Sequence, residues 1–399
     1  MWAAAAARGV ALPDAHHPEP LAGLDYALEL ELKTVALQAF WSAYQLPLRP
    51  APVVAAVRPR GYRTTTKRRA MAGRGGLPVL AFTGAPAPRS GAAASLLDEP
   101  SHVAVHQAAA KVLSRVGLRP LAAALNHLVV RGAPGALTVI LNVRFFDAAV
   151  VRHSRRLADE LAAADLGVGA AHLYLDPTGS DYYLEARRPA AAVTMKRLFG
   201  PDWLQVSLGE VRLRFPATVF SQVNDAMLPR IVDAAGDLLR PAADDVLLDL
   251  YCGYGLFALT VGAAAAGVVG IDSDGPTIEA ARRNAERLGS GDRAVFHAGR
   301  IDPAFLGRRL SPPERPELVL LDPPRQGTAA GVAAALAQRK PARVLHLACG
   351  ADEIPRELAA WCEAGMTLAR VVPLDLFPGT ANLETLLLLT PAGSRGRHG

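Results

Sequence analysis

The sequence predicts an α/β protein whose C-terminal part is a doubly wound, Rossmann-like domain. From about residue 216 onward, short apolar strands alternate with helical stretches, which is the pattern of a parallel sheet covered by helices. Helices and strands also mix between residues 25 and 215, but without that regular alternation. We therefore expect a flexible tail over 1–24, an α/β domain over 25–215 and the doubly wound domain over 216–399.

Length and composition indicate a folded protein with more than one core. The 399 residues are enough for two or three domains. Hydrophobic residues make up 51% and charged residues 20% of the chain, which excludes a disordered protein. The longest apolar run, over 256–271, is shorter than a membrane-spanning helix and contains glycines. We expect no membrane association, and a monomer is the default expectation.

Cysteine content and the N-terminus bear on location and metals. The three cysteines, Cys252, Cys349 and Cys362, are too few for a disulfide framework, a four-thiolate zinc site or an all-cysteine iron–sulfur site. Residues 1–12 lack an apolar core followed by a cleavage site, so a secretion signal is not indicated. The sequence predicts a reduced, cytoplasmic protein without a bound metal or iron–sulfur cluster, and an organelle-targeting leader stays open.

Local patterns predict the elements of the first 215 residues. Residues 1–24 are rich in Ala, Pro and His and show no periodicity, whereas an apolar stripe broken by charges predicts a helix over 25–44 with Asp25 as N-cap. A Pro-, Gly- and Ala-rich run over 85–94 predicts a loop. Residues 102–128 suit one helix or two. Further along we expect a helix over 152–164 and strands over 136–143, 171–175, 181–186 and 204–211.

The net charge of +6 is unevenly distributed. A basic segment over 49–74 contains Tyr62 and no acidic residue. Lys and Arg gain free energy by releasing counterions from a polyanion, so this segment predicts a nucleic-acid contact. A solvated arginine-rich loop is the alternative. The basic residues are Arg49, Arg58, Arg60, Arg63, Lys67, Arg68, Arg69 and Arg74.

The expected parallel sheet carries a glycine-rich turn after its first strand. Strands are predicted over 246–250, 268–271, 318–321 and 344–347. Gly253 and Gly255 belong to a Gly-x-Gly-x-x-Ala turn that opens a helix, which lets the backbone approach a ligand closely. Asp272 ends the next strand, at about the 20-residue spacing where an acidic side chain accepts hydrogen bonds from a ribose. The glycine-rich turn and Asp272 together predict an adenosine-containing cofactor, which is either a dinucleotide or S-adenosylmethionine. The alternative is that the turn is only structural.

Two features at the same sheet edge favour S-adenosylmethionine over a nicotinamide cofactor. The run Asp-Pro-Pro-Arg-Gln-Gly over 322–327 follows the third strand, and its two prolines make a stiff rim suited to holding a flat base. Cys349 ends the fourth strand, at the edge where open α/β sheets bind ligands. A strand-terminating turn and a core cysteine are the structural alternatives. Glu384, just before an apolar strand over 385–389, carries no signal by itself.

Five ordered motifs together resemble the RNA 5-methyluridine methyltransferases, which act on tRNA or ribosomal RNA. The resemblance is tight over about 201–390 and loose before that. The motifs are Phe-Ser-Gln-Val-Asn over 220–224, Asp-Leu-Tyr-Cys-Gly-x-Gly over 249–255, Asp-Pro-Pro-Arg-x-Gly over 322–327, Cys349 after a strand, and Asp-x-Phe-Pro-x-Thr-x-x-x-Glu over 375–384.

This resemblance implies a covalent mechanism. C5 of uracil is a poor nucleophile, so Cys349 is implied to attack C6 first, and Glu384 is implied to remove the C5 proton after methyl transfer. Arg325 is suited to a phosphate or to the uracil carbonyls, because guanidinium is a planar fork of donors. The residues implied to contact S-adenosylmethionine are Gln222, Tyr251, Gly253, Gly255, Asp272 and Asp322, and those expected to contact RNA are Arg325, Tyr62, Arg63, Lys67, Arg68 and Arg69.

The sequence also departs from the family pattern. Ala-Cys-Gly-Ala over 348–351 replaces the usual Ser-Cys-Asn-Pro, and Leu256 stands where many relatives carry Asn. A helix predicted over 25–44, in place of a small β-barrel, favours the compact tRNA-type organisation over the ribosomal type. Two alternatives stay open: a catalytically impaired RNA-binding or RNA-folding homologue, and a methyltransferase for another acceptor.

Overall fold

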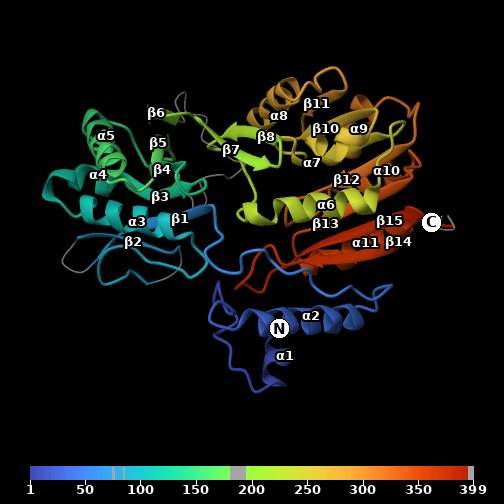
Figure 1. Cartoon of the computed structure of the whole chain (residues 1–399), viewed down its shortest axis with the longest axis horizontal. Helices are drawn as coiled ribbons and strands as arrows, with labels where there is room; N and C mark the ends of the chain where they lie inside the picture. The colour runs from blue at the N-terminus through green and yellow to red at the C-terminus, as the bar shows by residue number, and fades with distance from the viewer. Residues whose placement is uncertain (74–76, 84–85, 180–194, 394–399) are drawn as a thin grey trace. The chain divides into compact units, whose positions relative to one another are not determined.

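The computed structural model describes residues 1–73, 77–83, 86–179 and 195–393. Within it the chain forms two compact units (Figure 1). Unit 1 comprises Met1–Pro59, Ser207–Arg214 and Ala226–Gly399, and unit 2 comprises Arg60–Val206 and Phe215–Asp225. Residues 1–59 therefore belong with the C-terminal part of the chain, whereas the sequence assigned them to a tail and to the central domain.

Unit 1 contains the predicted doubly wound sheet. Its strand order is β11-β10-β9-β12-β13-β15-β14, and the neighbours from β11 to β13 pair in parallel. β15 pairs antiparallel with both β13 and β14. The fold class is thus confirmed. The strands are β9 (Val246–Leu250), β10 (Gly267–Asp272), β11 (Ala294–Ala298), β12 (Glu317–Leu321), β13 (Arg343–Ala348), β14 (Met366–Leu374) and β15 (Glu384–Pro391).

Helices cover this sheet because its central strands β9, β12 and β13 are mostly apolar and need both faces buried. α8 packs on β10 and β11, α6 on β13 and β15, and α11 on β14. The helices of unit 1 are α1 (Trp2–Ala6), α2 (Tyr26–Ala43), α6 (Leu228–Leu239), α7 (Leu256–Leu259), η4 (Val261–Ala264), α8 (Gly275–Arg287), α9 (Pro303–Arg309), α10 (Val332–Ala337), η5 (Ala351–Glu353) and α11 (Ile354–Glu363). η3 (Asp225–Met227) leads into α6.

Helix α2 starts where the sequence predicts, with the Asp25 carboxylate accepting the N–H groups of Ala27 and Leu28. The expected tail is different, because it contains α1 and the fully buried Leu21, whose N–H donates to the carbonyl of Gly379. This segment is fixed by packing on unit 1, which a composition-based argument does not detect.

Unit 2 is built on a six-stranded sheet in the order β2-β1-β3-β4-β5-β6, antiparallel except for the β4–β5 pair. Its strands are β1 (Thr65–Ala72), β2 (Pro78–Ala81), β3 (Leu125–Arg131), β4 (Leu137–Val143), β5 (Val168–Leu175) and β6 (Met195–Phe199). Its helices are α3 (Pro100–Leu113), η2 (Val116–Leu118), α4 (Arg119–Ala124) and α5 (Ala148–Ala163). The strand expected over 181–186 lies outside the described residues.

Two local expectations need correction. The helical stretch predicted over 102–128 ends at Ala124, and β3 follows at once as a strand with seven buried residues. The single strand predicted over 204–211 is a hairpin of β7 (Trp203–Leu208) and β8 (Val211–Pro216), since Gly209 adopts φ 56° and turns the chain.

Each unit has its own apolar core, as expected of separate folding units. Leu248, Leu321, Val344 and Trp361 belong to the core of unit 1.

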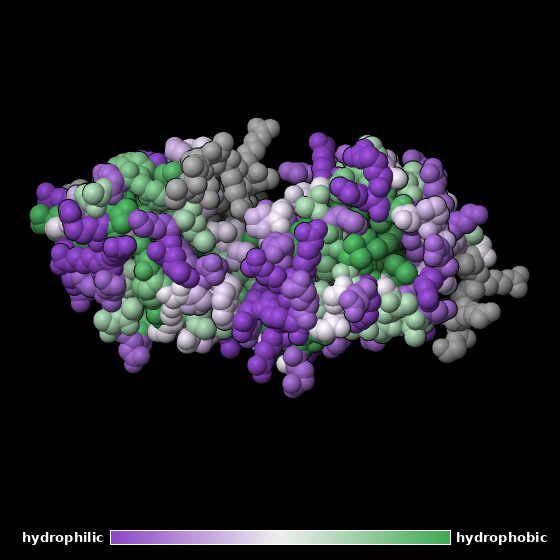
Figure 2. Space-filling view, turned by 90° about the horizontal axis from the view of Figure 1, so that it is seen from above, coloured by the Kyte–Doolittle hydropathy of each residue, from purple (hydrophilic) through white to green (hydrophobic). Residues whose placement is uncertain are grey.

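On the face seen from above, hydrophilic side chains gather at the end of unit 2 that carries α4 and α5 (Figure 2).

Candidate active site

The glycine-rich turn and the acidic strand end lie together at the carboxyl edge of β9 and β10. Gly253 and Gly255 adopt φ values of 55° and 89°, in the left-handed region that favours glycine. Asp272 accepts the Gly253 N–H at 3.0 Å through Oδ2 and the Asp274 N–H at 3.0 Å through Oδ1. Burial raises the pKa of Asp272. A carboxylate has four acceptor positions, so lone pairs remain for a ligand hydroxyl.

Backbone strain and an unsatisfied carboxylate mark the same turn. Tyr251 adopts φ 62°, a conformation that non-glycine residues rarely hold and that clusters at ligand sites. Burial raises its pKa to about 12. Asp249 accepts the Ala258 N–H at 2.8 Å, and its Oδ1 is buried without a partner among the described residues. A Cβ added at Gly253 would meet only Thr277, at 4.0 Å, so a ligand can approach this backbone closely.

Cys349 and Glu384 stand on neighbouring strands. Ala348, the last residue of β13, pairs with Thr385 of β15, so the residues one step further, Cys349 and Glu384, are adjacent across the pair. The Cys349 thiol is partly buried, with its Sγ 3.9 Å from the carbonyl oxygen of Pro323 in the proline rim. The structure therefore brings the rim, the thiol and the carboxyl group to one sheet edge.

Negative charge surrounds this thiol. Burial raises the pKa of Cys349 to about 12, and the carboxylates of Glu384, Glu353 and Asp322 act in the same direction. The exposed Arg325 acts in the opposite direction and lowers this pKa. Burial also raises the pKa of Asp322 to about 7, and that of Glu353 to about 7. The site thus holds protons near neutral pH, which suits chemistry that moves protons.

Two buried carboxyl oxygens here lack a hydrogen-bond partner within the described part of the chain. Glu384 is 2% exposed and its Oε2 is unpaired. Burial, Asp322 and Glu353 raise its pKa well above the usual value, while Arg325 lowers it. Glu353 accepts the Gly350 N–H at 3.3 Å through Oε1, and its Oε2 is unpaired. Unsatisfied buried acceptors of this kind need an explanation, and a proton-transfer site provides one.

A network from helix α11 holds the loop that follows the proline rim. Glu357 accepts the Thr328 N–H at 3.0 Å and the Thr328 hydroxyl at 2.7 Å. Gly327 adopts φ 70°, a backbone conformation that favours glycine, and a Cβ there would crowd the side-chain ends of Arg356 and Glu357. This contact explains the glycine of the 322–327 motif in physical terms.

Helix α2 holds the loop that leads to Glu384. The fully buried Lys33 donates to Asp375 at 2.7 Å and to the Phe377 carbonyl at 3.2 Å, and it pairs with Glu29 at 2.9 Å. Glu29 in turn accepts the Gly379 N–H at 2.5 Å. The loop over 375–380 is therefore tied to a helix far away in sequence.

The remaining predicted site residues lie in unit 2. Gln222 is buried in the segment Phe215–Asp225, where Arg131 donates to the carbonyls of Ala217 and Val219 at 2.6 and 2.7 Å and to the Ser221 hydroxyl at 2.6 Å. This arginine fixes the backbone of the 220–224 motif from within the same unit.

The basic segment is less accessible than the sequence suggests. Arg68 is 2% exposed, pairs with Asp98, donates to the Ala93 carbonyl at 2.7 Å and lies over the ring of Phe82. Tyr62 is also buried. Because both side chains are inside unit 2, neither is presented to RNA in this structure. Of the other basic residues expected to contact RNA, Arg63 and Lys67 are partly exposed and Arg69 is exposed.

Sequence reasoning missed two residues that shape the site. Glu353 follows the altered nucleophile loop and gave no separate signal. For Lys33 the spacing from Glu29 indicated an ion pair along the helix, but gave no sign that the pair is buried. Among the described residues, no group of three or more His, Cys, Asp or Glu is arranged to hold a metal ion, and no described helix is long and apolar enough to span a membrane.

Comparisons with known proteins concern the family and the fold. The model of the tRNA (uracil-5-)-methyltransferase family matches residues 175–292. An uncharacterised RNA methyltransferase of Thermosynechococcus vestitus is 34% identical over 194 residues, which is 48% of this chain and 42% of that protein. The 23S rRNA (uracil(1939)-C(5))-methyltransferase RlmD of Pectobacterium carotovorum is 35% identical over 249 residues, 62% of this chain and 52% of that protein. The chain thus spans about half the length of the curated relatives it matches.

One solved structure shares the fold over most of the chain. The tRNA (uracil-54, C5)-methyltransferase of Pyrococcus abyssi, crystallised with S-adenosyl-L-homocysteine, superposes with a TM-score of 0.67 at 18% identity. The superposition covers 93% of this chain and 85% of that one. At this level of identity the likeness concerns the fold alone.

Proposed function

This chain is a relative of the RNA 5-methyluridine methyltransferases, and on that premise we propose that it methylates C5 of a uridine in structured RNA. The observation that carries the proposal is the pairing of β13 with β15, which sets the Cys349 thiol beside the buried Glu384 carboxyl. A thiol and a base at adjacent strand ends are what attack at C6 and proton removal at C5 require.

The glycine turn fits S-adenosylmethionine as the methyl donor. Gly253 leaves its backbone open, Asp272 has acceptor positions for ribose hydroxyls, and Tyr251 is held in a strained conformation beside them. Gly255 and Asp322 complete the proposed set of cofactor contacts within unit 1, and the contact expected of Gln222, in unit 2, stays a prediction from the resemblance. When bound, S-adenosylmethionine supplies an electrophilic methyl group.

In the proposed reaction the sulfur of Cys349 bonds to C6 as its proton leaves, and the electrons of the C5–C6 double bond make C5 nucleophilic. Asp322 and Glu353, with pKa values raised to about 7, are suitable acceptors for the thiol proton. Once C5 carries the methyl group, Glu384 takes the C5 proton, the double bond reforms and the sulfur–C6 bond breaks. A carboxyl with a raised pKa is a strong base once ionised, and the positive charge of Arg325 favours that ionised form.

We propose tRNA as the favoured substrate over ribosomal RNA. The support for this choice is that the fold of a protein named for a tRNA substrate covers 93% of this chain, whereas the sequence match to a relative named for 23S rRNA covers 62% of it. Comparing methyl transfer to a tRNA transcript and to a 23S rRNA fragment tests this preference. Faster transfer to the rRNA fragment would reverse it.

A trapping experiment tests the chemistry. RNA that contains 5-fluorouridine has no C5 proton to release, so with S-adenosylmethionine it should leave a covalent protein–RNA complex on a denaturing gel. The Cys349→Ala variant should form none, while Cys362→Ala, which alters an exposed cysteine, should behave as wild type. Methyl transfer retained by Cys349→Ala would favour another acceptor, and absence of transfer in the wild type would favour an RNA-binding homologue.

A second variant tests the role of Glu384. Glu384→Gln cannot accept the C5 proton, so with ordinary RNA the adduct should persist and turnover should fall about 100-fold or more, as for loss of a general base. Gel analysis with radiolabelled RNA measures both quantities. Normal turnover without an accumulating adduct would remove Glu384 from the mechanism.

A further inference from the structure

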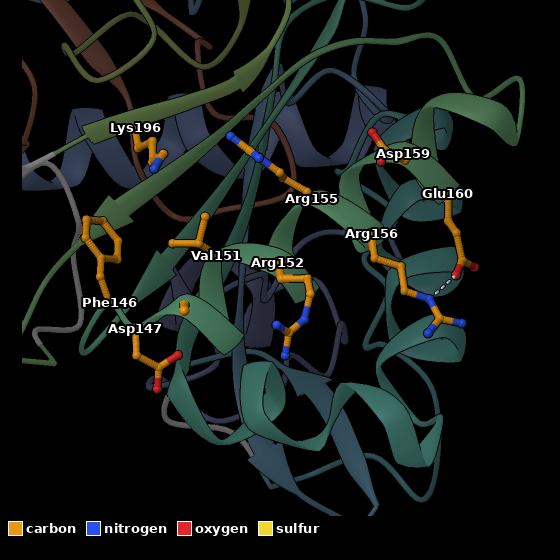
Figure 3. Close-up of a pocket in the computed structure, with 10 residues that line it drawn as sticks. Phe146, Asp147, Val151, Arg152, Arg155, Arg156, Asp159, Glu160 and Lys196 are labelled. Atoms are coloured by element: carbon orange, nitrogen blue, oxygen red, sulfur yellow. Dashed lines mark hydrogen bonds and ion pairs between the residues drawn. The ribbon is translucent and has the colours of Figure 1, made fainter.

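A groove on unit 2 carries a set of basic side chains that the proposed chemistry does not use. It has a volume of about 1010 Å³ and lies along helix α5 and strand β6 (Figure 3). Phe146 and Val151 contribute its apolar surface. Its charged lining residues are Asp147, Arg152, Arg155, Arg156, Asp159, Glu160 and Lys196.

Three of the cations in this groove have no anionic partner among the residues that the structure describes. Arg152, Arg155 and Lys196 are all exposed and make no ion pair there. The local carboxylates are mostly engaged elsewhere. Asp147 caps helix α5 by accepting the Val150 N–H at 2.6 Å, and Asp159 lies with Glu160 at the far end of the groove (Figure 3).

Glu160 neutralises a different arginine. It pairs with Arg156 at 3.4 Å and with Arg115 at 2.5 Å, so both of its oxygens are used. Arg155 and Lys196 therefore present positive charge at the β6 side of the groove, whereas Arg152 extends from α5 in another direction (Figure 3). Arg156 lines the same groove but pairs with Glu160, a counter-ion that it shares with Arg115, and this makes it an internal control.

The side chains of Arg155 and Lys196 extend toward each other from α5 and β6 (Figure 3). An anion bound between two positive side chains is attracted by both of them. Lys196 sits on a fixed strand, since its neighbour in the sheet register is Leu173 of β5. The positive pair is thus held on two regular elements rather than on a loop.

We propose that this groove binds the phosphodiester backbone of the RNA substrate, with Arg152, Arg155 and Lys196 as the phosphate contacts. The inference rests on the proposed function for its choice of polyanion. It places the electrostatic contact on α5 and β6 rather than on the 49–74 segment, whose Arg68 is buried in an ion pair. An extended groove with several cations suits a polymer of phosphates, because each neutralised phosphate releases counterions.

Fluorescence anisotropy with a labelled tRNA transcript tests this groove across a series of salt concentrations. The triple variant Arg152→Ala/Arg155→Ala/Lys196→Ala should bind at least about tenfold more weakly, and the slope of log K against log salt should decrease by about 2 to 3. Arg156→Ala should change affinity less than Arg155→Ala alone. An unchanged thermal midpoint shows that the triple variant is folded, since all three side chains are exposed.

The outcomes separate this inference from the proposed function. Wild-type affinity and slope in the folded triple variant would overturn the groove proposal, even if methylation by the wild type is intact. Loss of RNA binding in the triple variant would sustain it, even if the wild type proves unable to methylate. Inorganic phosphate at millimolar concentration should compete weakly, and competition as strong as that of unlabelled RNA would identify the site as one for a free anion and overturn the proposal.

Discussion

Glu353 is one of the carboxylates that raise the pKa of Cys349, and it also accepts hydrogen bonds from the backbone of the loop, including the Gly350 N–H. The family pattern places Asn and Pro after the nucleophile, and here Gly350 and Ala351 take those positions. A hydrogen bond from the backbone to Glu353 holds this loop, and the same carboxylate raises the pKa of the Cys349 thiol. Loop geometry and thiol reactivity are therefore linked through one side chain.

The variant Glu353→Gln separates these two effects. It keeps an oxygen acceptor for the Gly350 N–H but removes a negative charge, so the pKa of Cys349 should fall, by roughly one unit. The pH dependence of iodoacetamide alkylation at Cys349, followed by mass spectrometry, measures the change. Asp352→Asn is the matched control, because Asp352 is exposed and does not influence this thiol. An identical profile for wild type and Glu353→Gln would contradict the electrostatic role.

At the residue scale, sequence motifs identified the thiol and the carboxyl that the structure brings together. They did not identify Glu353, because a partner that acts through a backbone N–H has no fixed residue type. They also suggested Arg68 as a surface contact, since a run of basic residues does not reveal which members alternate into the core. β1 points Arg68 inward to Asp98.

Helix α2 carries a buried ion cluster that fixes the loop before Glu384. Lys33, Glu29 and Asp375 have no exposed side-chain surface. Removing one member of such a cluster leaves the others charged and uncompensated, which lowers the free energy of unfolding. Replacing the whole cluster with apolar residues is less destabilising. Helix α2 therefore acts as a support of the candidate site.

Lys33→Met should lower the free energy of unfolding by about 3 to 5 kcal/mol, because two buried carboxyl groups lose their counter-ion. Urea denaturation followed by circular dichroism measures this loss. Adding Asp375→Asn to Lys33→Met should recover part of the stability by removing one uncompensated charge. A loss below about 1 kcal/mol in the single variant would mean that water or rearrangement satisfies the pair.

At the element scale, the sequence predicted α2 and the parallel strands well, because their caps and apolar runs are local signals. The sequence-based prediction failed where contacts with residues distant in sequence determine the secondary structure. The predicted helical stretch over 102–128 includes residues 125–128, but these belong to β3, which pairs with both β1 and β4. The contacts of α2 with Asp375 and Gly379 could not be predicted either, because these residues lie near the far end of the chain.

The whole molecule has several carboxyl groups whose pKa values lie above the ordinary range. Burial raises the pKa of Asp225 to about 6 and those of Asp322 and Glu353 to about 7. The folded protein therefore keeps protons that the unfolded chain releases above about pH 4. Each such group contributes stability that is complete below the unfolded pKa and is lost as pH rises through the folded value.

Stability should accordingly fall between pH 5 and pH 7.5 more steeply in the wild type than in Asp322→Asn/Glu353→Gln, with a difference of at least about 1 kcal/mol. His346 acts in the opposite direction below about pH 6.5, since burial lowers its pKa to about 4, but its effect is common to both proteins. Urea midpoints at several pH values give the comparison. Parallel pH profiles would refute the raised pKa values.

The domain boundaries show the limit of sequence reasoning at this scale. The change of pattern near residue 216 is real, yet 1–59 fold onto unit 1 and Ser207–Arg214 return to it before Phe215–Asp225 rejoin unit 2. Periodicity describes segments in order along the chain. It carries no information about an N-terminal segment that packs against strands 300 or more residues away.

The bond between Lys33 and Asp375 spans 342 positions of the chain. During synthesis on the ribosome, Lys33 emerges long before its anionic partner exists, so helix α2 has no finished binding surface for most of translation. Loop closure over such a distance is slow and is completed after local structure has formed. A chain released before Asp375 is made would keep only the Glu29 half of this ion cluster, with the apolar side of helix α2 exposed, the kind of surface by which chaperones and proteases recognise incomplete proteins.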